Sequence, residues 1–105
     1  MEYCTVFCTV GNMDNARAIA SELVDRRLAA CVNIIPGVES IYEWKGQIQY
    51  DKELLLIIKS RMDKFDEIKK VIQSLHEYEL PEIIALPIEN GEKGYLKWID
   101  AYVND

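Results

Sequence analysis

Two short stretches of this chain are apolar at every position, and they constrain its fold more than any other feature. Residues 54–58 are Leu-Leu-Leu-Ile-Ile, and residues 83–86 are Ile-Ile-Ala-Leu. Because successive side chains of a strand point to opposite faces, a strand that is apolar at both parities must be covered on both faces of its sheet. The sheet that contains these strands therefore needs a helical layer on one face and a further layer on the other.

Turn residues and side-chain periodicity predict the remaining elements. Residues 3–10 alternate β-branched, aromatic and cysteine side chains up to Gly11-Asn12, which indicates a strand. Apolar side chains recur at helical spacing after Asp14 and again after Met62. In chain order we expect a strand at 3–10, a helix at 14–28, the two strands of a hairpin at 30–44 and 47–59, a helix at 62–75, a strand at 82–88 and a helix after Gly91.

Two glycine-containing pairs shape the predicted hairpin. Lys45-Gly46 turns the chain, and Pro36-Gly37 predicts a bulge or bend in the first strand. The far end of the hairpin carries large aromatic side chains that lie far from the predicted core, as in an oligomer interface. These are Tyr42, Trp44 and Tyr50.

The order β-α-β-β-α-β followed by a helix is that of a ferredoxin-like α+β fold, whose antiparallel sheet has the strand order 4-1-3-2. Right-handed crossovers place both main helices on one face of that sheet. The other face then receives no layer from the two helices, and self-association is the simplest way to cover it. The alternative is that the final helix folds back over this open face.

Composition bounds the classes of function. A length of 105 residues allows one domain, 1–105, and a net charge of -6 argues against a nucleic-acid-binding surface. The first ten residues lack the features of a signal peptide, and no apolar stretch is long enough to span a membrane. We therefore expect a cytoplasmic protein with no nucleic-acid or membrane partner. Cys4, Cys8 and Cys31 lack metal-finger spacing and fit reduced thiols, and we expect Cys4 and Cys31 in the core.

Residues 76–82 place the only histidine of the chain among three glutamates, between a helix and a strand. The topology brings His76 and Glu82 to the end of the sheet where the first strand ends, near Cys8. Thiolate, imidazole and carboxylate groups together suit an ion such as copper or zinc. The alternative roles are structural: His76 would interact with the helix C-terminus, and Cys8 would be a small buried hydrophobic residue.

Four segments in combination resemble a known family. They are LAACVNIIPGVESIYEWKGQI at 28–48, ELLLIIKSR at 53–61, HEYELPEIIALPIENG at 76–91 and YLKWI at 95–99. Over nearly its whole length the chain resembles the CutA divalent-cation tolerance proteins. This resemblance implies a ferredoxin-like fold, a homotrimer like that of the PII signalling proteins, and an association with tolerance to copper and other divalent cations. It implies no established catalytic reaction.

The resemblance also bears on individual residues. Cys8 matches a strand-borne cysteine proposed as a metal ligand in part of the family, and Glu82 matches the Pro-Glu that begins the fourth strand. The chain departs from the family pattern at Leu75, where members with the best-argued copper site carry a further histidine. It departs again at Glu77, where proline is usual, and the backbone before Tyr78 is freer as a result.

The leading functional hypothesis is a trimeric, non-enzymatic tolerance protein that binds copper or another divalent cation through Cys8, His76 and Glu82. An enzyme is the least favoured class. The turn after the first strand has no cation to hold a phosphate, and the glutamates around Cys8 raise rather than lower a thiol pKa.

A second hypothesis comes from the likeness to PII trimers. A sensor or adaptor of that kind binds a small organic ligand or a partner protein in clefts between its subunits. We expect such clefts to be lined by Tyr42, Trp44, Lys59 and Arg61. No GxxxxGK loop is present, so the sequence gives no motif for a nucleotide.

Overall fold

An antiparallel sheet with the strand order β2-β3-β1-β4 organises the computed structural model, which describes residues 2–103. Met1, Asn104 and Asp105 of the predicted domain lie outside the described residues. The elements are β1 (Tyr3–Val10), α1 (Met13–Asp25), β2 (Cys31–Trp44), β3 (Gln47–Arg61), a 3-10 turn (Met62–Lys64), α2 (Phe65–Leu75), β4 (Ile84–Pro87) and α3 (Lys93–Tyr102). This order confirms the predicted ferredoxin-like α+β fold with an additional C-terminal helix.

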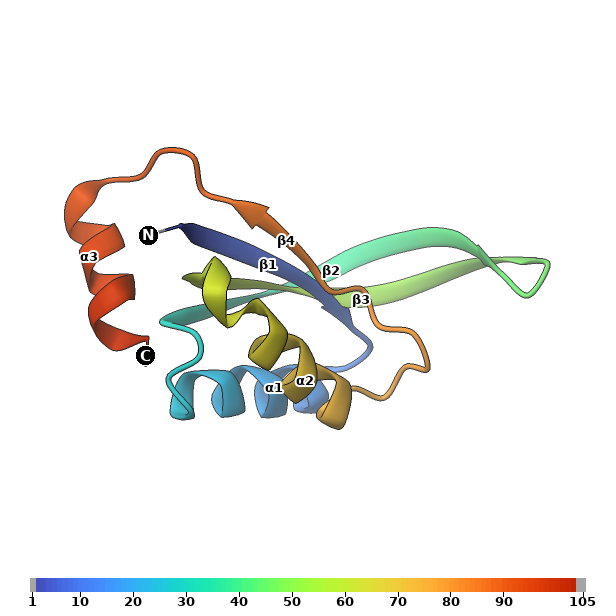
Figure 1. Cartoon of the computed structure of the whole chain (residues 1–105). Coiled ribbons are helices and arrows are strands. Elements are labelled where there is room, and N and C mark those ends of the chain that lie inside the picture. Colours follow the sequence, from blue (N-terminus) through green and yellow to red (C-terminus); the bar gives the residue numbers. More distant parts are fainter. Residues whose placement is uncertain (1, 104–105) are drawn as a thin grey trace.

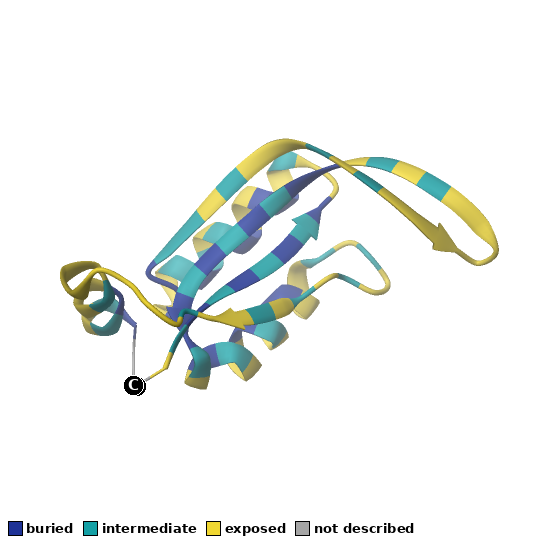
Figure 2. Cartoon of the chain, turned by 90° about the horizontal axis from the view of Figure 1, so that it is seen from above, coloured by how far each residue is buried: buried dark blue, intermediate teal, exposed yellow. Residues whose placement is uncertain are grey.

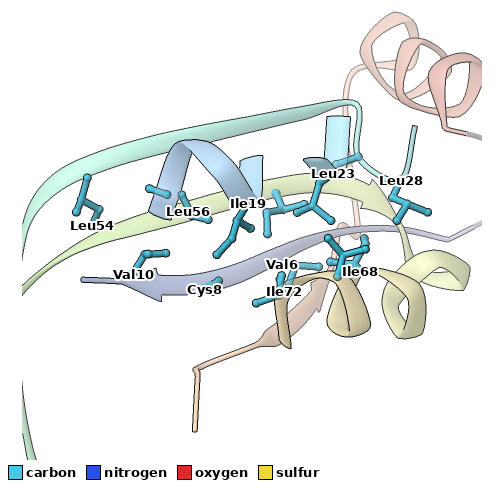
Figure 3. Packing of buried hydrophobic residues seen from close by; sticks show 14 of the residues in the cluster. Val6, Cys8, Val10, Ile19, Leu23, Leu28, Leu54, Leu56, Ile68 and Ile72 are labelled. Atoms are coloured by element: carbon cyan, nitrogen blue, oxygen red, sulfur yellow. The ribbon is translucent and has the colours of Figure 1, made fainter. Parts of the chain in front are cut away.

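Helices α1 and α2 lie side by side on one face of the sheet, as the crossover rule predicted (Figure 1). Side chains of β1 alternate between this face and the other, so that Cys4, Val6, Cys8 and Val10 are fully buried. They pack with apolar side chains from β3 and from both helices (Figure 3). The main contributions of the helices and β3 to this core are Ile19, Leu23, Leu56, Ile58, Ile68 and Ile72.

The opposite face of the sheet, which we call the open face, also carries large apolar side chains. Phe7 of β1 pairs in register with Ile57 on one side and with Ile84 on the other. Ile84 is 50% exposed and Leu86 is 42% exposed. The part of the chain that the structure describes therefore leaves an apolar surface without a covering layer.

Helix α3 lies at one end of the sheet and does not cover the open face (Figure 1). Its buried residue Ile99 packs with Ala30 and Val103 in a small cluster, against which Tyr3 also packs. Arg61 of β3 pairs with Asp100 of α3 at 3.1 Å. The alternative in which the final helix folds back over the open face is therefore wrong.

The β2–β3 hairpin extends well beyond the rest of the sheet, and most of its far half is exposed (Figures 1 and 2). Lys45 and Gly46 both have positive φ angles, 52° and 81°, as a tight hairpin turn requires. The predicted irregularity is confirmed as a register shift between Ile35 and Val38, with Gly37 at a φ of 81°. The hairpin aromatics lie away from the core, as expected.

Helix α1 ends at Asp25, before the predicted Leu28, because the chain reverses there through a left-handed residue. Arg27 has a φ of 59°, its N–H donates to Val24 O, and the N–H of Leu28 donates to Leu23 O at 3.0 Å. These two bonds satisfy carbonyl groups at the helix end in a Schellman arrangement. Leu28 then enters the core instead of continuing the helix.

Cys31 departs from its predicted place in the core. In β2, Val32 and Ile34 are the side chains that pack against the core, whereas Cys31 pairs in register with Lys59. Since alternate residues of a strand face opposite sides, Cys31 lies on the open face and is only partly buried. Cys4 is fully buried, so the prediction was right for that residue and wrong for Cys31.

Candidate functional site

The segment that links α2 to β4 is held against the end of β1 by His76. Its Nε2 lies 2.7 Å from the carbonyl oxygen of Thr9, and its Nδ1 lies 3.0 Å from the backbone nitrogen of Tyr78. A carbonyl only accepts and an N–H only donates, so these two bonds assign a neutral ring with its proton on Nε2. The last carbonyl of α2, Leu75 O, accepts instead from Asn15 Nδ2 at 2.9 Å. The side chain of His76 therefore joins the linking segment to β1, while its backbone N–H donates to Ile72 O at the end of its own helix.

Glu77 of the linking segment is also tied down. Asn12 caps α1 by accepting from the Asn15 backbone N–H at 2.8 Å, and its Nδ2 donates to Glu77 Oε1 at 2.8 Å. A side-chain hydrogen bond thus holds the segment where proline would restrict the backbone. The sequence alone did not predict the hydrogen bond between Asn12 and Glu77.

Cys8 is a buried thiol on the helix-facing side of β1. Burial, then the negative charges of Glu82 and Glu53, raise its pKa to about 12 from an ordinary value of 9.0. The thiol form is therefore favoured over the thiolate that binds metals. The influence of Glu82 on this pKa agrees with the prediction that both residues lie at the same end of the sheet.

The three predicted metal ligands do not form a ready site in this conformation. Among residues 2–103 no group of three or more His, Cys, Asp and Glu side chains is placed to hold a metal ion. Both ring nitrogens of His76 are hydrogen-bonded, and Cys8 is directed into the core. Metal binding through Cys8, His76 and Glu82 stays a prediction, and it requires these side chains to rearrange.

A cleft of about 680 Å³ lies beside this segment, between it and the far half of the β2–β3 hairpin. We call it the acidic cleft, because four glutamates line it together with three aromatic side chains. The glutamates are Glu53, Glu77, Glu79 and Glu82, and the aromatic residues are Tyr42, Trp44 and Tyr78.

Glu53 is the most buried carboxylate of the cleft, with 6% of the residue exposed. Its Oε2 accepts from the hydroxyl of Tyr78 at 2.7 Å. Burial and this hydrogen bond to Glu53 raise the pKa of Tyr78 well above its ordinary range. A Cβ atom at Gly11 would come within 2.9 Å of the Tyr78 hydroxyl, so glycine leaves the space through which Tyr78 reaches Glu53.

Two of the four residues predicted to line a cleft between subunits also line the acidic cleft of the single chain, and the cleft between subunits stays a prediction. Tyr42 and Trp44 line the acidic cleft, whereas Lys59 and Arg61 do not. The Lys59 ammonium donates to Asn33 Oδ1, and Arg61 is paired with carboxylates near α3. Glu53 and Tyr78 were missed as a linked pair. Their only sequence signal was a charged residue directly before the all-apolar run at 54–58.

Within the described residues no helix is long and apolar enough to cross a membrane. Comparison with known proteins identifies the chain more directly. The family model described as "CutA1 divalent ion tolerance protein" matches residues 4–102. The chain belongs to the CutA1 divalent ion tolerance family.

Named relatives agree with this assignment. The "Divalent-cation tolerance protein CutA" of Thermus thermophilus is 49% identical over 94 residues, which cover 90% of this chain and 91% of that protein. The "Protein CutA, chloroplastic" of Arabidopsis thaliana is 47% identical over 90% of this chain but 52% of its own length. The chain thus spans about half the length of that plant relative.

Solved structures of CutA1 proteins share the fold. The CutA1 crystal structure from Oryza sativa superposes with a TM-score of 0.97 at 41% sequence identity, covering 100% of this chain and 96% of the other. The structure of the divalent cation tolerance protein from Thermus thermophilus gives a TM-score of 0.94 at 45% identity, covering 97% and 99% of the two chains.

Proposed function

We propose that this chain acts in the tolerance of divalent cations as a cytoplasmic, non-enzymatic homotrimer that binds copper or a related divalent cation weakly. The observation that carries this proposal is the family match over residues 4–102, whose description names divalent ion tolerance. The relative from Thermus thermophilus bears the same function in its name.

The homotrimer is proposed from the open face. Phe7, Ile57 and Ile84 form one continuous row across three strands, and the described chain does not cover it. A second and third copy that cover this row would bury apolar surface that an isolated chain exposes to water. The apolar run at 54–58, which faces both sides of the sheet, is consistent with this arrangement.

Cys8, His76 and Glu82 are the proposed metal ligands. Binding requires loss of the Cys8 proton, which its raised pKa of about 12 opposes, and release of His76 from Thr9 O or Tyr78 N. Both requirements lower the affinity, so the proposal is specifically for weak binding.

Anaerobic titration with Zn²⁺, and with Cu⁺ held by a competing chelator, tests this set. Cys8→Ser and His76→Gln should each weaken binding at least tenfold. Cys4→Ser is the matched control, because Cys4 lies on the same strand and the same face and is equally buried. Unchanged affinity in both Cys8→Ser and His76→Gln would reject these ligands, and an equal loss in Cys4→Ser would show that the effect is not specific to the site.

A second candidate function is a PII-like sensor or adaptor that binds a small ligand or a partner protein in clefts between subunits. The acidic cleft, with Tyr42 and Trp44 in its lining, favours this candidate. A metal-free ligand that raises the melting temperature would support it.

A further inference from the structure

The buried carboxylate of Glu53 has no positive partner within the described chain. Only 6% of the residue is exposed, and its one side-chain hydrogen bond among residues 2–103 is the bond that Oε2 accepts from Tyr78. No Lys, Arg or His side chain of the described chain forms an ion pair with Glu53. Oε1 of Glu53 is not among the buried unpartnered side-chain atoms of the described chain, so it faces the cleft, where a cation from outside the chain can reach it.

The surroundings of Glu53 determine what kind of cation fits. Three further carboxylates, Glu77, Glu79 and Glu82, line the same cleft and favour positive charge. The walls also include Trp44, Ile41 and Leu80, which offer an aromatic ring and apolar side chains. Aromatic rings attract cations through their faces, and Trp44 already has the ammonium of Lys45 at 5.8 Å from its ring centroid.

A bare metal ion does not match this cleft well. A volume of about 680 Å³ is far larger than one ion, and no group of three ligating side chains in the described chain converges on one point. Metal ions prefer several oxygen, nitrogen or sulfur ligands at short distance and gain little from apolar walls. An organic cation binds favourably to both, because its charge interacts with the carboxylates and its apolar part contacts the apolar walls of the cleft.

We propose that the acidic cleft binds a small alkylammonium ligand, with its ammonium group at Glu53 and its alkyl chain along the apolar wall at Leu80, in the direction of Trp44. This inference deepens the second proposed function, ligand binding in a cleft, and uses no step of the metal proposal. In it, Tyr78 is a positioning residue, because its hydroxyl fixes one oxygen of Glu53 while the other faces the ligand.

The test uses n-pentylammonium as the probe and 1-pentanol as its neutral counterpart. The chain has two tryptophans, so an NMR spectrum of ¹⁵N-labelled protein gives two indole N–H signals. Trp44 lines the cleft, and Trp98 lies on α3 outside it. We expect n-pentylammonium to shift the Trp44 signal in a saturable way and to leave Trp98 unchanged, with 1-pentanol at least tenfold weaker.

Two variants separate the charge of Glu53 from its packing. Glu53→Gln keeps an oxygen that accepts from Tyr78 but removes the negative charge. It should lower the affinity for n-pentylammonium at least tenfold. Glu89→Gln is the matched control, since it makes the same charge change at an exposed residue outside the cleft. The Glu89→Gln variant should bind n-pentylammonium with the same affinity as the unmodified chain.

Three results would overturn the inference. Equal binding of 1-pentanol would show a cleft that takes small molecules without selecting a cation, and the second proposed function would survive. Unchanged affinity in Glu53→Gln would exclude the proposed ion pair. No response to either probe, with a Trp44 signal that moves on dilution of the protein alone, would show that another copy fills the cleft, and ligand binding there would fail as well. The comparison of the two probes needs no variant, so it decides the question even if Glu53→Gln does not fold.

Discussion

Replacing Ile84 by glutamate should disrupt self-association through the open face. Ile84 lies on β4 at the end of the row that it forms with Phe7 and Ile57, and it is 50% exposed in the single chain. Full burial of an isoleucine side chain contributes about 1.5–3 kcal/mol, so covering the exposed half of Ile84 contributes about 1 kcal/mol per copy. In a trimer that is about 3 kcal/mol, or roughly a hundredfold in the assembly constant.

The introduced carboxylate adds to this loss. Removing a charged group from water without a partner costs several kcal/mol per ion. Since Ile84 faces away from the helices and the core, its replacement should leave the fold of each chain intact. We therefore expect Ile84→Glu to be a folded monomer under conditions in which the unmodified chain is a trimer.

Light scattering after size-exclusion chromatography, over a dilution series, measures the mass of each species, and circular dichroism checks the fold. Ala18→Glu is a suitable control, because Ala18 is exposed on α1 at the opposite face of the sheet. Ile84→Val should retain the assembly. If Ile84→Glu has the mass of the unmodified chain at every dilution, the open face is not the subunit interface and the reasoning from its apolar row is wrong.

Two further predictions concern the core. Ile72→Ala removes a fully buried side chain between α2 and the sheet, and it should lower the free energy of unfolding, measured by chemical denaturation, by about 2–5 kcal/mol. Gln73 is exposed on the same helix, so Gln73→Ala should change the free energy of unfolding by less than about 0.5 kcal/mol. The raised pKa of Cys8 stabilises the fold fully below the ordinary thiol pKa of 9.0, and this contribution is lost as the pH rises from there toward about 12. The stability of the unmodified chain should therefore fall over that range more steeply than that of Cys8→Ala; parallel pH profiles of unfolding free energy would contradict the effect of burial on Cys8.

Local signals were sufficient to predict the elements and their order. The alternation in residues 3–10 gave β1 with its observed bounds, Tyr3–Val10, because alternation in a half-buried strand directly reflects its two faces. Asn12, which lies just before the predicted helix, forms the cap of α1. Lys45-Gly46 located the hairpin turn, since few residue pairs accept positive φ angles in succession.

The site was harder to predict because it depends on contacts between distant segments. Glu53 and Tyr78 are 25 positions apart and meet only because Gly11 leaves room for the tyrosine. Neither a local pattern nor a spacing rule reports such a contact. Lys59 lies farther along β3 than Glu53 and does not line the acidic cleft, which shows that position along a strand, as well as its face, decides which residues converge.

The metal and alkylammonium proposals are linked through Glu82, which is a proposed metal ligand and also lines the acidic cleft. The charge of Glu82 also opposes ionisation of Cys8, and Glu53 acts on that thiol in the same direction. A cation in the cleft would reduce both effects, because a positive charge near two carboxylates offsets their influence on a neighbouring thiol. An organic cation would thereby favour the thiolate form of Cys8 while it occupies the carboxylate that a metal ion needs.

These two consequences have opposite effects on metal binding. The sign of the coupling between the organic cation and the metal ion therefore depends on which consequence dominates. Coordination by Glu82 is a direct contact, whereas the thiol is influenced through space and remains buried, so the loss of Glu82 outweighs the gain and the two cations compete.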